Sequence, residues 1–153
     1  MVHALIAAAR PGDVLVLTMA EPEPVALVGE LLATQAKVRG VAGILVDGAV
    51  RDLDELEALA LPIWARFVRA RGATKEKVGR LDVPVRVGGA EIRPGDIVTL
   101  DCDGAVVVPS GRAEEVESLA LARETRETEL RARLEEGALS YDLHGLRRLV
   151  EGS

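Results

Sequence analysis

The stretch GILVDGAVRD, residues 43–52, decides the fold of this chain. Its first part, Gly43–Asp47, is a short apolar run that is typical of a buried strand, and Gly48 permits a sharp exit from that strand. Residues 52–59 follow with leucines at helical spacing, and residues 62–68 return as a β-rich run. This alternation of strand, helix and strand predicts an α/β fold.

A helix precedes the buried strand and ends near Arg39, where Gly40 is placed as its C-terminal glycine. Apolar periodicity starts this helix near Pro24, so that Glu30 lies in its middle as a solvated side chain. The alternative is that Glu30 lies where the helix begins, because free backbone N–H groups at a helix N-terminus bind carboxylates or phosphates.

Residues 10–17 and 93–100 each contain an Arg-Pro-Gly-Asp turn followed by a β-rich run.

The strands in the second half of the chain are predicted to be antiparallel. Two hairpins are expected. They pair residues 83–87 with 90–92 and residues 97–100 with 105–108.

A charged helix over residues 112–136, closed by Gly137, and a short helix over residues 143–150 are predicted to end the chain. Since no low-complexity linker divides the sequence, we expect a single domain over residues 1–153. Within that domain, residues 1–110 form an α/β core and residues 111–153 form a C-terminal helical segment.

Composition excludes several classes of protein. With 153 residues, 48% of them hydrophobic and 29% charged, the chain is typical of globular proteins. No apolar run is long enough to cross a bilayer, and Met1–Ala9 lacks the marks of a signal peptide, so we expect no membrane partner and a cytoplasmic location. A net charge of −6 and 2% aromatic residues argue against nucleic-acid binding. The single cysteine, Cys102, excludes an internal disulfide. The absence of asparagine favours a thermophilic source, although a GC-rich genome explains the same bias.

Arg51 and Asp52 are the richest candidates for chemistry. They follow the C-terminal end of the buried strand, where open α/β sheets usually bind ligands. A guanidinium there can bind substrate oxygens, and a carboxylate can hold Mg²⁺ or Mn²⁺. The structural alternative is a helix cap, since Asp52 followed by Glu55 is close to a capping box. The pattern alone favours the cap, because caps are commoner than sites.

Glu30, twenty intervening residues and then Arg51-Asp52 resemble the Asp/Glu-x20-Arg-Asp motif of the RraA-like family, which includes the 4-hydroxy-4-methyl-2-oxoglutarate aldolases. The likeness covers nearly the whole chain. It is carried by the stretches PGDVLV (11–16), GELLAT (29–34), RGVAG (39–43), DGAVRD (47–52), VPV (83–85), RPGD (93–96), DGAVVVP (103–109) and GALSYD (137–142).

The resemblance implies a swivelling β/β/α-type fold with a mixed sheet and a long C-terminal helix, assembled as a homotrimer or a dimer of trimers. It places the start of the first long helix near Gly29, against the periodicity. It also implies that Asp52 binds a divalent cation, Mg²⁺ or Mn²⁺, directly, and that Glu30 binds the cation through a water. Arg51 would contact the substrate, together with the backbone N–H groups of Gly29, Glu30, Leu31 and Leu32.

The activity that the resemblance implies is that of a lyase. Such an enzyme cleaves a C–C bond of 4-hydroxy-2-oxo acids, decarboxylates oxaloacetate, or does both, through a pyruvate enolate held at the metal. Glu30, Arg51 and Asp52 would be the catalytic residues, with Glu30 accepting the proton of the C4 hydroxyl and Arg51 stabilising the enolate. The alternative is a non-catalytic regulator, since members of the family are named for inhibiting ribonuclease E. The pairing of Arg51 with Asp52 favours chemistry.

Two features depart from the family's pattern. Family members usually carry several dozen more residues before the Pro-Gly-Asp turn than this sequence does. The glycine-rich stretch that follows their first strand is replaced by residues 18–24, TMAEPEP, which are stiffer and more acidic. This replacement is expected to reshape the pocket.

Overall fold

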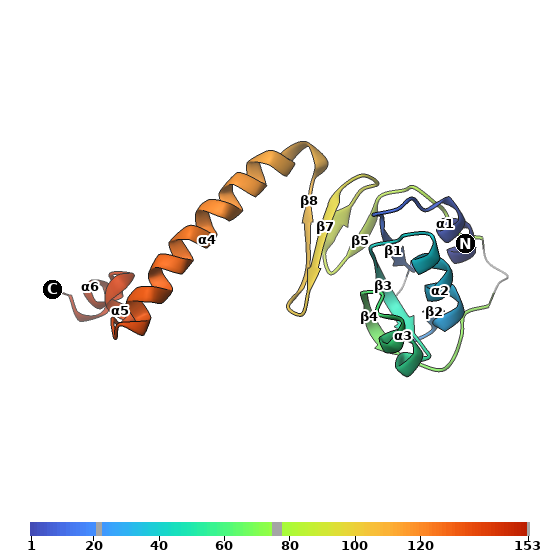
Figure 1. Cartoon of the computed structure of the whole chain (residues 1–153), viewed down its shortest axis with the longest axis horizontal. Helices are drawn as coiled ribbons and strands as arrows, with labels where there is room; N and C mark the ends of the chain where they lie inside the picture. Colours follow the sequence, from blue (N-terminus) through green and yellow to red (C-terminus); the bar gives the residue numbers. More distant parts are fainter. Residues whose placement is uncertain (21–22, 75–77, 153) are drawn as a thin grey trace. The chain divides into compact units, whose positions relative to one another are not determined.

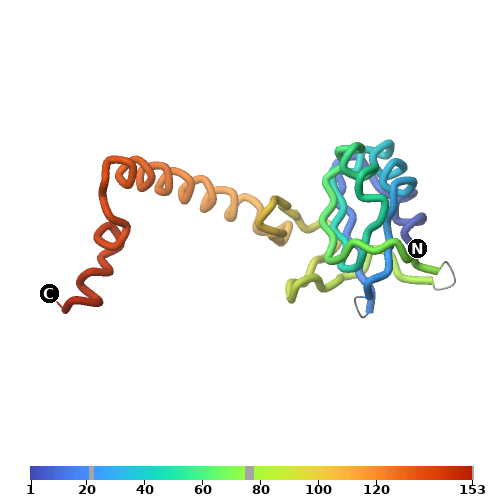
Figure 2. The backbone as a smooth tube through the Cα atoms, turned by 90° about the horizontal axis from the view of Figure 1, so that it is seen from below, coloured from blue at the N-terminus to red at the C-terminus, as the bar shows by residue number. Residues whose placement is uncertain are grey.

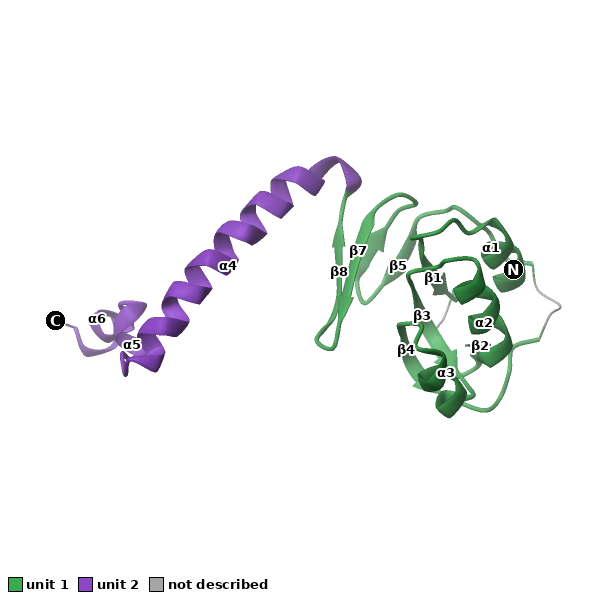
Figure 3. Ribbon diagram, viewed as in Figure 1, with its two compact units in different colours: residues 1–109 green, residues 110–153 purple. Residues whose placement is uncertain are grey.

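The computed structural model describes residues 1–20, 23–74 and 78–152. Two compact units make up the chain, residues 1–109 and residues 110–153 (Figure 3). The expectation of a single domain over residues 1–153 stays a prediction. Within the described residues, no helix has both the length and the apolar character that a membrane span needs.

A parallel sheet forms the centre of the first unit. Its middle strand, β3 (Gly43–Val50), has all eight residues buried. Along one edge of β3 lie β1 (Val14–Thr18) and then β2 (Ala26–Val28), and along the other lies β4 (Ile63–Val68), all parallel to it (Figure 1). Because β3 is covered on both edges and both faces, its sequence is a nearly continuous apolar run.

Three helices contribute to the hydrophobic core of this unit. They are α1 (Val2–Ala8), α2 (Glu30–Val38) and α3 (Leu53–Leu59), and α2 lies beside α3. The tube of Figure 2 shows the same packing from a second direction. The core cluster contains at least one buried side chain from each of these three helices and from β1, β2 and β3. Periodicity did not predict α1, whose single fully buried residue is Ile6.

Two antiparallel hairpins follow in the sequence, as predicted. β5 (Val85–Val87) pairs with β6 (Ala90–Ile92), and β7 (Ile97–Asp101) pairs with β8 (Gly104–Val108). The indole N–H of Trp64, on β4, donates a 2.7 Å hydrogen bond to the carbonyl of Asp101, which ties the second hairpin to the parallel sheet. The fold class is therefore α/β with parallel and antiparallel parts, as the sequence predicted.

The second unit is helical. A 3₁₀ turn (Ser110–Arg112) leads into α4 (Ala113–Glu135), a helix of 23 residues with none of them buried. The predicted final helix over residues 143–150 is instead two short helices, α5 (Ser140–Leu143) and α6 (Leu146–Glu151). Gly145 separates them because its φ of +66° lies in the left-handed region, which a continuous helix does not allow.

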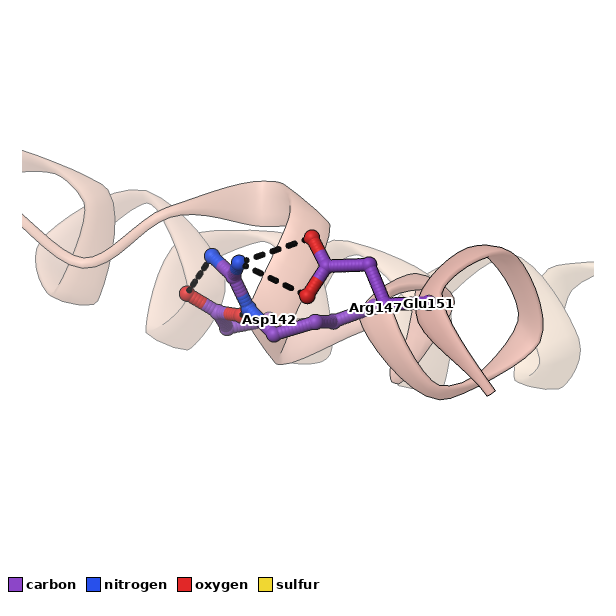
Figure 4. Close-up of polar contacts among 3 residues, drawn as sticks. All are labelled: Asp142, Arg147 and Glu151. Carbon is purple, nitrogen blue, oxygen red and sulfur yellow. Dashed lines mark hydrogen bonds and ion pairs between the residues drawn. The ribbon is translucent and has the colours of Figure 1, made fainter. Parts of the chain in front are cut away.

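Arg147 fastens α5 to α6. Its guanidinium donates hydrogen bonds to the carboxylates of Asp142 and Glu151 (Figure 4). The same guanidinium lies 4.9 Å from the ring centre of Tyr141. All of these side chains lie near the protein surface, so we expect the network to order the turn more than it stabilises the fold.

Two sequence-based expectations about the first unit were wrong. Residues 24–38 are not one helix, because β2 occupies Ala26–Val28 and α2 begins only at Glu30. Gly48 does not end its strand, since β3 continues to Val50. Gly48 is buried against Leu27, and a Cβ there would lie 3.3 Å from that side chain, so this glycine marks a close approach within the sheet. Of the unusual stretch 18–24, residues 21 and 22 lie outside the described part.

Candidate active site

The site lies where two neighbouring parallel strands end. β2 leads into Gly29 and Glu30, and β3 leads into Arg51 and Asp52. The amide of Arg51 donates a 3.1 Å hydrogen bond to the carbonyl of Val28, which holds the two strand ends side by side. The carboxyl ends of parallel strands are the usual ligand-binding edge of such a sheet.

Asp52 joins the two segments. Its carboxylate oxygen Oδ2 accepts a 3.0 Å hydrogen bond from the amide of Glu30, the first residue of α2. A carboxylate at a helix N-terminus is stabilised by the free N–H groups there, by about 0.3–1 kcal/mol at an exposed position. Asp52 therefore caps α2, which is distant in sequence.

The capping-box interpretation of Asp52 was wrong. Asp52 is the residue before α3, but its side chain makes no capping hydrogen bond to that helix. Its backbone has φ +61° and ψ +50°, a left-handed conformation that aspartate tolerates better than most residues. This conformation directs the chain away from a standard cap, and the carboxylate bonds α2 instead. Uncommon backbone geometry of this kind is frequent at functional sites.

Gly29 leaves room for both charged side chains. A Cβ at this position would lie 2.5 Å from Oδ2 of Asp52 and 2.9 Å from Nε of Arg51. Either distance is too short for a real contact, so any larger residue would displace the pair. Glycine is required here for space, since its backbone is extended.

Arg51 presents a cation beside that carboxylate. Nε of Arg51 lies 3.6 Å from Oδ2 of Asp52, with the two side chains 48% and 41% exposed. An ion pair this exposed contributes only about 0–1 kcal/mol to folding. Within the described parts of the chain, no acceptor takes a hydrogen bond from the guanidinium. Its N–H groups are thus available to a ligand.

Glu30 is placed differently from Asp52. The structure confirms that it opens α2, as the resemblance implied and the periodicity did not. Its half-buried carboxylate accepts a 2.9 Å hydrogen bond from the hydroxyl of Thr34, one turn further along the helix. The carboxylate of Asp52 bonds the backbone amide of Glu30, whereas the carboxylate of Glu30 bonds Thr34, and the convergence of the two carboxylates on one cation stays a prediction.

A wide depression of about 1530 Å³ lies beside these residues. Gly29, Leu31 and Leu32 line it from the N-terminal turn of α2, and Arg51 and Asp52 line it from the end of β3. Glu30 is not among its lining residues in the described part of the chain. Further lining residues are Arg71 and Gly72, from the segment after β4, and Arg80 and Arg86. The carboxylates of Glu23, Asp52 and Asp82 line the same hollow. The four arginines offer guanidinium groups to an anionic ligand.

The residues of this site fit a hard divalent cation. In the described part of the chain, no three His, Cys, Asp or Glu residues gather as a metal-ligand group, so a closed zinc site is not formed there. The hydrogen bond from Glu30 and the 3.6 Å ion-pair distance to Arg51 both involve Oδ2 of Asp52, and among the described residues Oδ1 accepts no hydrogen bond. Mg²⁺ commonly takes one or two carboxylates and fills its other positions with water and substrate. Asp52 could hold such an ion through Oδ1.

Comparison with known proteins identifies the family. The family model described as RraA-like, "Aldolase/RraA", matches residues 1–107. The chain belongs to the RraA-like family. Its curated relatives include a protein of Halalkalibacterium halodurans named "Putative 4-hydroxy-4-methyl-2-oxoglutarate aldolase", which is 36% identical over 143 residues, or 94% of this chain and 66% of the relative.

Solved structures of other proteins share the fold. An uncharacterized protein from Pseudomonas syringae pv. tomato has a TM-score of 0.84 at 27% identity, covering 89% of this chain and 64% of that protein. Streptomyces coelicolor RraAS2, described as an unusual member of the RNase ES inhibitor RraA protein family, has a TM-score of 0.79 at 37% identity, covering 86% and 67%. The chain thus spans about two-thirds of the length of these relatives.

Sequence reasoning missed two residues that contact the predicted site. Thr34 bonds the Glu30 carboxylate, and Gly72 lies against the tip of Arg51. Thr34 sits one helical turn after Glu30, a spacing that could have suggested the contact once the helix start was known. Gly72 lies more than twenty residues after Arg51, and no local pattern connects the two.

Proposed function

We propose that this RraA-like chain is a cytoplasmic, divalent-metal-dependent carbon–carbon lyase acting on 2-oxo acids. Its substrates would be 4-hydroxy-2-oxo acids of the 4-hydroxy-4-methyl-2-oxoglutarate type, oxaloacetate, or both. The observation that carries the proposal is the position of Asp52 and Arg51 at the N-terminus of α2, on the wall of the depression. The name of the Halalkalibacterium relative supports the aldolase activity.

Asp52 would hold the cation, Mg²⁺ or Mn²⁺, through the oxygen that α2 does not use. The bound cation would supply Lewis-acid stabilisation to the oxygens of the 2-oxo acid. Leu31 and Leu32 lie in the first turn of α2, where backbone N–H groups have no partner within the helix, so their amides can bind the substrate carboxylate. The amide of Glu30 already donates a hydrogen bond to Asp52. Its role would therefore be to position the Asp52 carboxylate.

Arg51 would stabilise the charge that develops during bond cleavage. In aldol cleavage the C3–C4 bond breaks, its electron pair forms an enolate, and the C4 hydroxyl gives up its proton. Glu30 is the proposed acceptor of that proton, for which its carboxylate must turn from Thr34 toward the depression. In decarboxylation the electron pair of the breaking bond forms the same enolate as CO₂ leaves. In both reactions the enolate takes a proton at C3 and becomes pyruvate.

The direct test is a screen for pyruvate release from several 2-oxo acids, with Mg²⁺ or Mn²⁺ and with a chelator. We expect release that requires the metal and that Asp52→Asn abolishes. Asp54→Asn is the matched control, because Asp54 is an exposed carboxylate in the first turn of α3. Metal-dependent release that survives in Asp52→Asn would reject the site, and the absence of release from every substrate would reject the lyase.

The second candidate function is a non-catalytic regulator of a ribonuclease. It is supported by the similarity to Streptomyces coelicolor RraAS2, which belongs to a family of RNase inhibitors. The test is inhibition of RNA cleavage by a ribonuclease E-type enzyme at rising concentrations of this chain. Inhibition that is unchanged in Asp52→Asn, without pyruvate release, would favour this function over the lyase.

A further inference from the structure

Gly72 is fixed beside Ala26, the first residue of β2. The amide of Ala26 donates a 2.8 Å hydrogen bond to the carbonyl of Arg71, and the amide of Ala73 donates a 3.0 Å bond to the carbonyl of Ala26. These two bonds form a parallel bridge between Ala26 and Gly72. The backbone at Gly72 is therefore held by the sheet, on a segment that also lines the depression.

The guanidinium of Arg51 lies against this glycine. A Cβ at Gly72 would lie 2.8 Å from Nη1 of Arg51 and 3.7 Å from Cζ. Gly29 lies similarly close to the Arg51 side chain, nearer its backbone, where a Cβ would lie 2.9 Å from Nε. Arg51 thus passes between two glycines that come from different parts of the chain, one after β2 and one after β4.

A side chain at position 72 would conflict with Arg51 through lack of space, and not through backbone conformation. Gly72 lies outside the left-handed region, which would favour glycine for its own sake. The atom that an added Cβ would displace is the far end of a flexible side chain, so the fold can absorb the change by moving the guanidinium. Gly72→Ala is therefore expected to move Arg51 without unfolding the protein.

We propose that Gly72 is a positioning residue, which together with Gly29 sets the direction of the Arg51 guanidinium toward the depression. This inference rests on the proposed function of Arg51 as the group that binds the 2-oxo acid. No acceptor among the described residues orients that guanidinium by a hydrogen bond, and its nearest carboxylate oxygen is 3.6 Å away. Its direction is thus controlled by the backbone surfaces on either side of it.

A double-mutant cycle tests the proposal through activity. In the wild-type background, Gly72→Ala is expected to lower kcat/KM for pyruvate release at least about tenfold, the usual effect of misplacing a charged hydrogen-bond donor. In an Arg51→Lys background the same substitution is expected to cost nothing further, because lysine has no Nη1 atom at that place. Equal losses in both backgrounds would show that Gly72 acts independently of Arg51 and would overturn the proposal.

Gly111→Ala is the matched control. Gly111 also lies outside the left-handed region, and a Cβ there meets nothing within 4 Å. Both alanine variants are expected to keep the melting temperature of the wild type, while only Gly72→Ala lowers kcat/KM. A large fall in the melting temperature of Gly72→Ala would mean that this glycine is needed for folding and not for placing Arg51.

A spectroscopic readout separates this proposal from the lyase itself. The ¹⁵Nε–H resonance of Arg51, identified by its loss in Arg51→Lys, is expected to shift in Gly72→Ala and to stay in place in Gly111→Ala. An unmoved resonance in Gly72→Ala would overturn the positioning role. A shifted resonance in a protein that releases no pyruvate would support the positioning of Arg51 and reject the proposed function.

Discussion

At the scale of single residues, the site depends on a contact of Asp52 with α2 that the sequence around Asp52 does not predict. Asp52 stands directly before α3 with Glu55 three residues later, and that pattern predicts a cap for its own helix. In the structure its carboxylate instead accepts a hydrogen bond from the backbone amide of Glu30. Long-range contacts of this kind could be anticipated only from the resemblance to the RraA-like family, because helical spacing describes neighbours in sequence alone.

Glu30→Gln separates the two proposed reactions. Aldol cleavage needs a base for the C4 hydroxyl proton, whereas oxaloacetate has no such hydroxyl. We therefore expect the variant to lose aldol cleavage by about 10²–10⁴-fold while its decarboxylation of oxaloacetate stays within a few-fold of the wild type. Both rates are measured by pyruvate release from the two substrates.

The control for this prediction is Glu57→Gln, an exposed glutamate on α3 whose removal should change neither rate. Glutamine at position 30 retains the backbone amide that bonds Asp52 and an oxygen that can accept the Thr34 hydroxyl. A parallel loss of both reactions in Glu30→Gln would therefore contradict the role of Glu30 as the base for the C4 hydroxyl.

At the scale of helices and strands, much of the fold could be predicted from the sequence. The strand over residues 62–68 was predicted as a β-rich run, and both hairpins were predicted from the glycine-containing turns between their strands. The stretch 24–38 was misjudged for a physical reason. A strand of three residues, Ala26–Val28, is too short to show a period of two, so its apolar residues extend the helical pattern of α2.

The α5–α6 turn is expected to loosen in acid. A hydrogen bond from Arg147, and the charge of that guanidinium, hold the pKa of Asp142 below its ordinary value of 3.8. A carboxyl group whose pKa is lower in the folded chain stabilises it above the ordinary value, and the effect is lost as the pH falls through the lower, folded value. Amide signals of Leu146–Val150 in a ¹⁵N NMR pH titration should therefore hold steady at neutral pH and move together below pH 3.8.

Asp142→Asn should remove this transition and leave the signals of the Arg123–Glu127 pair on α4 unaffected, because that ion pair is separate. A carboxyl group of Asp142 that titrates at or above its ordinary pKa would contradict the assignment of the α5–α6 contact to Arg147.

At the scale of the whole molecule, we propose that copies of the chain assemble with one another. The long helix α4 buries no residue. Two of its leucines, Leu119 and Leu121, are 60% and 58% exposed. These two side chains are apolar surface that a second copy of the chain could cover. The homotrimer or dimer of trimers that the family resemblance implied is our proposal for what covers them.

Light scattering on the purified chain tests the assembly. We expect a mass of about three or six times the 16.2 kDa of one chain. Replacing Leu119 and Leu121 together by glutamate should lower that mass, whereas the same change at the exposed Thr125 and Thr128 should not. A mass of one chain over the whole concentration range would contradict the assembly.

The central claim is that Asp52 holds a divalent cation beside Arg51, and Mn²⁺ binding tests it most directly. Electron paramagnetic resonance measures the free ion as protein is added, which requires neither turnover nor knowledge of the substrate. We predict uptake of one Mn²⁺ per chain, strengthened by oxalate as a mimic of the 2-oxo acid enolate, and lost in Asp52→Asn but not in Asp54→Asn. Undiminished uptake by Asp52→Asn, or no uptake by the wild type, would contradict the account.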